Sequence, residues 1–195
     1  MAHDSADATA ATKAQLRHTF RQRRAALLAA AQGPLLEQAR HRLPQHVGPG
    51  QRLGIYWPLA GEADLRGLEA EPGLRGRLAL PRVSQGALGY RPWGPESPLK
   101  PDDTGISAPA DGPDLEPEQL GLLLVPALAS DLQGFRLGYG GGWFDRLRSA
   151  APWRAVPAVA VLPQGCLVEQ LPRDPWDVPL DGWLHEGGLD WLRAV

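Results

Sequence analysis

The sequence predicts an α/β fold, because short apolar segments typical of strands alternate with segments that have the spacing of helices. Residues 122–128 (LLLVPAL) are the clearest strand: they are few and apolar throughout, as in a parallel strand buried on both faces. With 195 residues the chain suits one domain with a substantial core. The alternation alone leaves the order of the strands open.

The N-terminal third is expected to contain a tail and two helices. We interpret residues 1–10 as a flexible tail and not as a signal peptide, since they carry two aspartates and no apolar stretch. A helix follows over residues 10–31, with one apolar stripe made of Leu16, Phe20 and Leu27. Gly33 should end this helix, and Pro34 suits the first position of a second helix that stops at Pro44.

The middle of the chain is expected to contain three strands. Residues 52–57 and 77–83 are the first two, with a helix near residues 64–69 between them. Residues 87–93 should pair with the second strand through a short turn. Residues 94–118 are rich in proline, glycine and aspartate and have no period, so we predict a long surface connection there.

The C-terminal third continues the alternation of strands and helices. A buried strand is predicted over residues 155–162, where the sequence AVPAVAVL is almost entirely apolar. A short strand is expected over residues 182–186, and a terminal helix over residues 189–193.

Composition excludes several classes of protein. A net charge of −2 and a pI near 6.2 give no sign of a nucleic-acid binder. No apolar run approaches the roughly 20 residues that span a membrane. Cys166 is the only cysteine, so a reducing compartment suits the chain and the thiol is expected in the core. We therefore expect a cytoplasmic, globular, monomeric protein that binds neither nucleic acid nor membrane.

A glycine-rich segment follows the clearest strand. Residues 138–142 (GYGGG) lead into residues 143–148, which have the spacing of a helix start. In such an arrangement backbone N–H groups converge on an anion, since glycine lets the main chain approach a phosphate closely. Arg136 and Arg146 can supply positive charge, and Asp145 can hold a magnesium ion between phosphate oxygens. The segment therefore indicates a nucleotide phosphate site; the alternative is a flexible turn, because neither standard glycine fingerprint is present.

Charged residues elsewhere have two interpretations each. The first helix carries a basic stripe made of Lys13, Arg17, Arg21 and Arg24. One interpretation is that the whole stripe is a solvated face. The other is that Lys13 and Arg17, which are one turn apart, reach the same anion. We place Arg21 and Arg24 at the surface. Glu62 is either a favourable acid near a helix start or a ligand contact. Asp177, taken alone, is typical of a loop.

Three motifs resemble those of one known family. Residues 134–146, G-F-R-L-G-Y-G-G-G-W-F-D-R, closely resemble the signature of the 5-formyltetrahydrofolate cyclo-ligase family, also called 5,10-methenyltetrahydrofolate synthetases. K-A-Q-L-R at residues 13–17 is similar to the start of the family's first helix, and Y-W-P-L-A-G-E-A-D-L at residues 56–65 resembles its substrate segment. Asp177 aligns with a family aspartate. Departures from the family pattern are Trp143 for tyrosine, Ala108 for glutamate and Trp176 where histidine is frequent.

The resemblance implies the fold and the binding site for ATP. The family fold is a single α/β domain, a mostly parallel sheet with helices on both faces, which would span residues 1–195. ATP contacts are implied for Lys13, Arg17, Arg136, Gly138, Tyr139, Gly140, Gly141, Gly142, Trp143 and Phe144. Arg136 and Asp145 are the implied catalytic residues, and Asp145 and Asp177 are the implied ligands of Mg²⁺.

The resemblance also implies a site for a reduced folate. Glu62 would recognise the pterin ring, whose amino and ring N–H groups donate in a planar fork that a carboxylate can accept. Trp57 would pack against the folate. Tyr139 and Trp143 either stack on the folate or fill the core, as aromatic side chains often do.

The implied reaction is the ATP- and Mg²⁺-dependent cyclisation of 5-formyltetrahydrofolate to 5,10-methenyltetrahydrofolate, with release of ADP and phosphate. One alternative is a related nucleotide-dependent enzyme acting on another substrate, since divergent relatives of the family are linked to thiamine metabolism. The other is a non-catalytic ATP-binding protein. Glu62 argues against the first alternative and Asp145 against the second, while Ala108 and Trp176 leave the first open.

Overall fold

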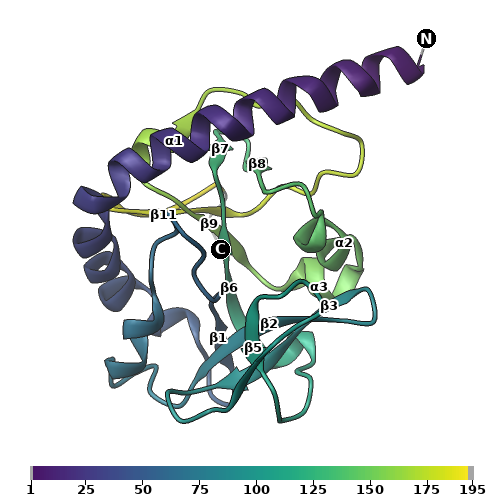
Figure 1. Cartoon of the computed structure of the whole chain (residues 1–195). Coiled ribbons are helices and arrows are strands. Elements are labelled where there is room, and N and C mark those ends of the chain that lie inside the picture. Colours follow the sequence, from purple (N-terminus) through teal and green to yellow (C-terminus); the bar gives the residue numbers. More distant parts are fainter. Residues whose placement is uncertain (1, 193–195) are drawn as a thin grey trace.

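Seven strands form the central sheet of the protein: β1 (Arg52–Gly54), β2 (Leu78–Ser84), β3 (Ala87–Trp93), β6 (Leu120–Pro126), β9 (Ala158–Val161), β11 (Gly182–His185) and β12 (Gly188–Trp191). The computed structural model describes residues 2–192 (Figure 1). The strands lie in the order β12-β11-β9-β6-β1-β2-β3, and the five central strands run parallel. The edge strands β3 and β12 run antiparallel to their neighbours. The predicted α/β fold with a mostly parallel sheet is confirmed.

The remaining elements surround this sheet. The α-helices are α1 (Ala2–Arg42), α2 (Trp143–Ser149) and α3 (Ala151–Ala155). Two small sheets are formed by β4 (Leu99–Pro101) with β5 (Ser107–Pro109), and by β7 (Ala129–Asp131) with β8 (Arg136–Leu137) and β10 (Leu167–Val168). The short 3₁₀ helices are η1 (Pro44–His46), η2 (Arg66–Ala70), η3 (Pro117–Gln119) and η4 (Gln164–Cys166).

Two apolar cores lie on opposite faces of the sheet, because successive side chains of a strand alternate between its faces. In β6, Leu123 and Val125 belong to one core, whereas Leu122 and Leu124 belong to the other. The first core also contains Phe20 of α1, Leu147 of α2 and the buried Cys166. The second contains Leu35 and Ala39 from the second half of α1, and Leu43 directly after it. Helices therefore cover both faces, as predicted.

The helix α1 begins at Ala2 and thus includes the described part of the predicted tail, residues 2–10. This segment is rich in alanine, the strongest helix former. Among the described residues, no helix combines the length and the apolar character needed to cross a membrane.

The predicted break at Gly33 and Pro34 is wrong, since α1 continues to Arg42 with Pro34 inside it. Its buried residues recur at intervals of four through this point, at Ala31, Leu35 and Ala39, and the next interval falls on the buried Leu43 just after the helix. The packing of this apolar face offsets the ~3 kcal/mol that a proline costs inside a helix. Figure 1 shows α1 crossing one end of the sheet and then bending downward. Glycine and proline are common at such bends, so Gly33 and Pro34 mark a change in the direction of α1 and not the end of the helix.

Two further predictions differ from the structure. Residues 94–118 contain the hairpin of β4 and β5, in which Ala108 is buried, instead of an irregular connection. The segment predicted as a terminal helix, described as far as residue 192, instead forms β12. Gly187 and Gly188 allow the tight turn between β11 and β12, and β12 then supplies the hydrogen bonds that the edge of β11 lacks.

Candidate active site

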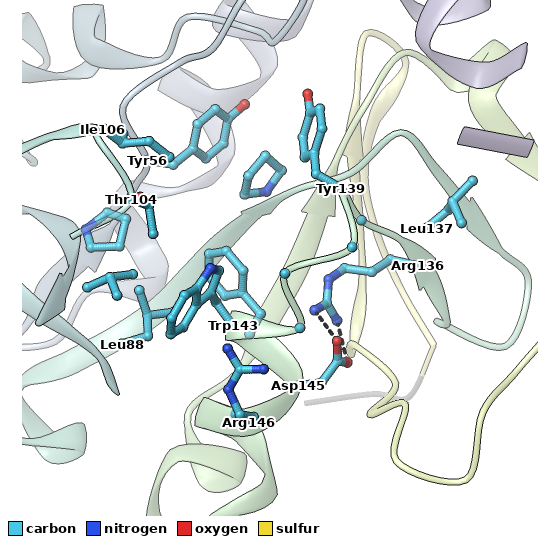
Figure 2. Close-up of a pocket in the computed structure, with 18 of the residues that line it drawn as sticks. Tyr56, Leu88, Thr104, Ile106, Arg136, Leu137, Tyr139, Trp143, Asp145 and Arg146 are labelled. Carbon is cyan, nitrogen blue, oxygen red and sulfur yellow. Dashed lines mark hydrogen bonds and ion pairs between the residues drawn. The ribbon is translucent and has the colours of Figure 1, made fainter. Parts of the chain in front are cut away.

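A cavity of about 800 Å³ lies beside the carboxyl ends of β1 and β6, where ligands of α/β folds commonly bind. The strand β1 ends at Gly54, earlier than predicted, and the next residues leave the sheet so that Tyr56 and Trp57 line the cavity. The other walls come from α1, the loop between β4 and β5, the glycine segment, α2 and residues 174–177. Figure 2 shows side chains from several of these elements converging on the cavity.

Every residue that the sequence assigns to the site borders this one cavity: Lys13, Arg17, Trp57, Glu62, Arg136, Gly138, Tyr139, Gly140, Gly141, Gly142, Trp143, Phe144, Asp145 and Asp177. These residues come from four separate parts of the chain. The structure therefore brings together what the motifs place far apart in sequence.

The glycine segment between β8 and α2 has a backbone that only glycine adopts readily. Gly140 has φ 105°, and Gly142 has φ 64° at the N-cap of α2. The Arg17 side chain lies along this segment: its Nε donates to the Gly138 carbonyl at 3.0 Å, and a Cβ on Gly140 would be 3.6 Å from its Cζ. Arg17 is thus held beside the backbone that we expect to meet phosphate.

Arg136 and Asp145 form a two-pronged ion pair (Figure 2). The two terminal nitrogens of Arg136 donate to the two carboxylate oxygens of Asp145 at 3.2 and 3.0 Å, a geometry that fixes both groups. The Val178 amide also donates to Asp145, at 3.2 Å. The pair joins β8 to α2 across the glycine segment.

Lys13 reaches from α1 to the segment around Asp177. Its Nζ lies 2.6 Å from both Asp174 Oδ2 and Asp177 Oδ2, and the Lys13 side chain is only 9% exposed. The Asp174 amide donates to the same Asp177 oxygen at 2.8 Å. Lys13 therefore lies between two carboxylates at the cavity, with its charge partly neutralised.

The carboxylate oxygens of Asp145 and Asp177 are suitable ligands for a magnesium ion that also contacts phosphate. Mg²⁺ usually takes one or two carboxylates and completes its octahedron with water and substrate phosphate oxygens. A carboxylate offers about four lone-pair sites, so both aspartates retain acceptor capacity beside their hydrogen bonds. Within residues 2–192 no group of three or more His, Cys, Asp or Glu could hold a metal. An ion here would consequently depend on phosphate ligands.

Glu62 is buried at the cavity; one of its carboxylate oxygens is hydrogen-bonded, and the other has the Arg24 guanidinium 3.9 Å away but no hydrogen bond. Its Oε2 accepts from the Leu59 amide at 2.8 Å, whereas Oε1 has no hydrogen-bond partner. Burial raises the pKa of Glu62, and the Leu59 amide, the Tyr139 hydroxyl and Arg24 oppose this rise. An unpaired, buried carboxylate oxygen is costly unless a donor reaches it, so the site favours a ligand that carries N–H groups.

The aromatic residues are stacked with arginines. The guanidinium of Arg66 lies 4.4 Å from the ring centre of Trp57, and that of Arg146 lies 4.3 Å from the ring centre of Trp143. Trp176 is 65% exposed although it borders the cavity. Both tryptophans thus form part of the cavity wall; Trp57 also packs against the second core, whereas Trp143 belongs to neither core.

Sequence reasoning missed Arg24 and Asp174. The prediction of Arg24 at the surface is wrong: its side chain is 2% exposed, and its Nη1 donates to the Ala127 carbonyl at 3.1 Å. A signal was present, because positions 13, 17 and 24 are related by one and three helical turns and share one side of α1. Arg21 is exposed, as predicted. Asp174 has no motif of its own and is identified only through Lys13.

The fold and the cavity together are those of an α/β protein with a candidate ligand site at the carboxyl ends of its parallel strands. The model of the 5-formyltetrahydrofolate cyclo-ligase family matches residues 9–186. The chain therefore belongs to this family, and it is a ligase of folate one-carbon metabolism.

Relatives and solved structures agree with this assignment. The chain is 33% identical over 170 residues to the 5-formyltetrahydrofolate cyclo-ligase of Escherichia coli (strain K12), a match that covers 83% of this chain and 93% of the relative. It is 32% identical over 179 residues to that of Mycolicibacterium smegmatis, covering 87% and 91%. The NMR structure of the Aquifex aeolicus 5,10-methenyltetrahydrofolate synthetase superposes with a TM-score of 0.74 at 27% identity, covering 94% of each chain.

Proposed function

We propose that this cavity binds ATP, Mg²⁺ and 5-formyltetrahydrofolate together, and that the cyclo-ligase reaction proceeds there through phosphoryl transfer to the formyl oxygen. The observation that carries the proposal is that all the residues assigned to nucleotide, metal and folate border one cavity of about 800 Å³. If ATP and 5-formyltetrahydrofolate bound in separate cavities, the phosphoryl group would have to cross water between them.

The chemistry explains why ATP is needed. The oxygen of a formamide is a poor leaving group. When it attacks the γ-phosphorus, ADP leaves and the formyl carbon becomes part of an imidate phosphate. The second folate nitrogen then attacks this carbon, loses its proton and closes the ring, and the former formyl oxygen departs as part of inorganic phosphate.

Such a reaction needs positioning and neutralisation of charge more than it needs a protein nucleophile. We assign the phosphate groups to Lys13, Arg17, Arg136 and the backbone of residues 138–142. Mg²⁺, when bound, would neutralise charge on the phosphate oxygens, and Asp145 and Asp177 would hold it.

Glu62 and the aromatic wall are assigned to the folate. The unpaired Oε1 of Glu62 supports an N–H donor as its ligand, which a pterin ring supplies. Trp57 and Tyr139 lie in the same cavity and offer apolar faces to the flat ring.

The test uses the purified full chain with Mg-ATP and 5-formyltetrahydrofolate, and follows methenyltetrahydrofolate absorbance and phosphate release together. We expect both products in equal amounts and neither product when ATP is omitted or replaced by a non-hydrolysable analogue. Tight binding of Mg-ATP with no product from the folate would reject the proposal and favour another substrate.

A further inference from the structure

The guanidinium of Arg24 lies behind the folate side of the cavity, on the part of α1 that faces the glycine segment. It is buried, and its hydrogen bonds go to groups other than Glu62: Nη1 donates to the Ala127 carbonyl at 3.1 Å, and Nη2 donates to the Tyr139 hydroxyl. Hydrogen bonds therefore hold both terminal nitrogens of the Arg24 guanidinium in place.

The same guanidinium is the nearest cation to Glu62. Arg24 Nη1 lies 3.9 Å from Glu62 Oε1, which is close enough for a strong charge interaction and too far for a hydrogen bond. Both side chains are only 2% exposed, so water screens this interaction little. Glu62 thus has a compensating charge beside it and still keeps Oε1 free.

The other titratable groups around Glu62 carry no positive charge that could replace that of Arg24, although the Tyr139 hydroxyl also lowers the pKa of Glu62. Tyr139 comes from the glycine segment and Tyr56 from the end of β1, and Figure 2 shows their hydroxyls pointing the same way. The Tyr56 hydroxyl donates to the Ala63 carbonyl at 2.9 Å. Asp64 is negative and is paired with Arg66 at 2.6 Å. Burial, followed by the charge of Glu62, raises the pKa of Tyr139 to about 12, so this phenol stays neutral.

We propose that Arg24 is a positioning residue for the folate: it keeps Glu62 ionised while Tyr139 and the Ala127 carbonyl hold its guanidinium away from the oxygen that accepts the substrate's N–H groups. This inference rests on the proposed role of Glu62. A protonated carboxylate could not accept the donor fork of a pterin with both oxygens, and an arginine bonded to Oε1 would compete with the substrate's N–H groups for that oxygen. Arg24 thereby sets both the charge and the availability of Glu62.

Two substitutions on opposite sides of this contact should move the pH dependence in opposite directions. Arg24→Gln removes the charge but keeps a donor for Ala127, so Glu62 should protonate at higher pH. The acid limb of kcat/KM for the folate is then expected to rise by roughly one pH unit or more, the usual effect of an opposite charge at this distance. Tyr139→Phe keeps the ring but frees the guanidinium to bond to Glu62 Oε1. Folate binding should weaken, and the acid limb should move to lower pH, because a charge-assisted hydrogen bond from Arg24 then replaces the effect of the neutral Tyr139 hydroxyl on the pKa of Glu62.

Matched variants separate this role from a structural one. Arg24→Lys keeps the positive charge, so its acid limb should stay near that of the unchanged chain. Arg23→Met removes an exposed arginine next to Arg24 and should leave the pH profile unchanged. KM for ATP should remain constant in the Arg24→Gln variant, because the phosphate contacts lie elsewhere. Thermal unfolding of each variant shows whether it is folded.

The measurement is the pH profile of kcat/KM for 5-formyltetrahydrofolate, together with calorimetric binding of the folate in the absence of ATP. If Arg24→Gln and Tyr139→Phe lower folate affinity by the same factor at every pH, with the acid limb unmoved, the proposal is wrong and Arg24 only supports the fold. A Glu62→Gln variant that loses the acid limb while Arg24→Gln does not shift it would also reject the role of Arg24. Absence of turnover in the unchanged chain would instead reject the proposed function.

Discussion

Asp145 connects the ion pair, the glycine segment and the proposed magnesium ion. Its two oxygens accept from Arg136 and from the Val178 amide, so the carboxylate is oriented before any ligand arrives. A metal ligand whose orientation is fixed by hydrogen bonds needs little rearrangement to bind. We therefore expect Asp145 to matter more through its charge than through its contribution to folding.

This expectation can be tested with Asp145→Asn, which keeps an oxygen for the Val178 amide and for one nitrogen of Arg136. Turnover should fall strongly, and the affinity for Mg²⁺ in the presence of ATP should fall at least tenfold, about the lower limit seen when support of a metal site is lost. The thermal midpoint without ligands should change little. Calorimetric titration with Mg²⁺ and ATP measures the affinity independently of turnover.

Asp111→Asn is the control, because this aspartate is exposed and lies away from the cavity lining. It should leave both turnover and Mg²⁺ affinity unchanged. Unaltered Mg²⁺ affinity in Asp145→Asn would show that the metal assignment is wrong.

Prediction of individual residues from the sequence depended on motifs. Glu62, Arg136 and Asp145 were identifiable because each lies in a segment with a recognisable pattern, and all three border the cavity. The spacing of positions 13, 17 and 24 puts Arg24 on the same side of α1 as Lys13 and Arg17, but a stripe of basic residues has this spacing whether it faces water or a buried carboxylate. The charge pattern of a helix does not reveal which part of the fold covers it.

At the scale of elements, α1 shows how tertiary packing overrides local preference. Gly33 and Pro34 are both poor helix formers, yet both lie inside the helix. The apolar residues on either side of them meet one continuous core, so the chain keeps its helical register. The final strand β12 is a second case: residues 189–192 are too few for their periodicity to decide between helix and strand, and the free edge of β11 decides it.

The continuity of α1 predicts that Gly33→Ala stabilises the protein. A methyl group at position 33 meets no atom within 4 Å, and alanine is the better helix former. We expect the free energy of unfolding to rise by about 0.5–1 kcal/mol, measured by urea denaturation. If the helix ended at Gly33, this glycine would be expected in the left-handed conformation, and alanine would destabilise.

Gly50→Ala provides the matched contrast. This position also has open space around a Cβ, but its φ is +77°, which alanine adopts only with strain. The substitution should destabilise the protein. Equal destabilisation by Gly33→Ala and Gly50→Ala would contradict a continuous α1.

At the scale of the whole molecule, the parallel sheet explains why distant motifs meet. The carboxyl ends of β1 and β6 lie side by side, so the segment that carries Glu62 and the one that carries the glycines open onto the same cavity. The α/β class could be predicted from alternating apolar segments, and the family resemblance supplied the sheet type. The strand order depends on pairings between residues far apart in sequence, which local patterns do not specify.

In the proposed reaction the γ-phosphoryl group of ATP is transferred to the formyl oxygen within one cavity, and this oxygen then leaves as part of inorganic phosphate. The most direct measurement starts from 5-formyltetrahydrofolate labelled in its formyl group with the heavy oxygen isotope. The full chain converts it with Mg-ATP in ordinary water, and mass spectrometry determines the label in the released phosphate. We expect one labelled oxygen in each phosphate, up to the enrichment of the substrate. Unlabelled phosphate, with the heavy oxygen recovered in water, would contradict the proposed reaction.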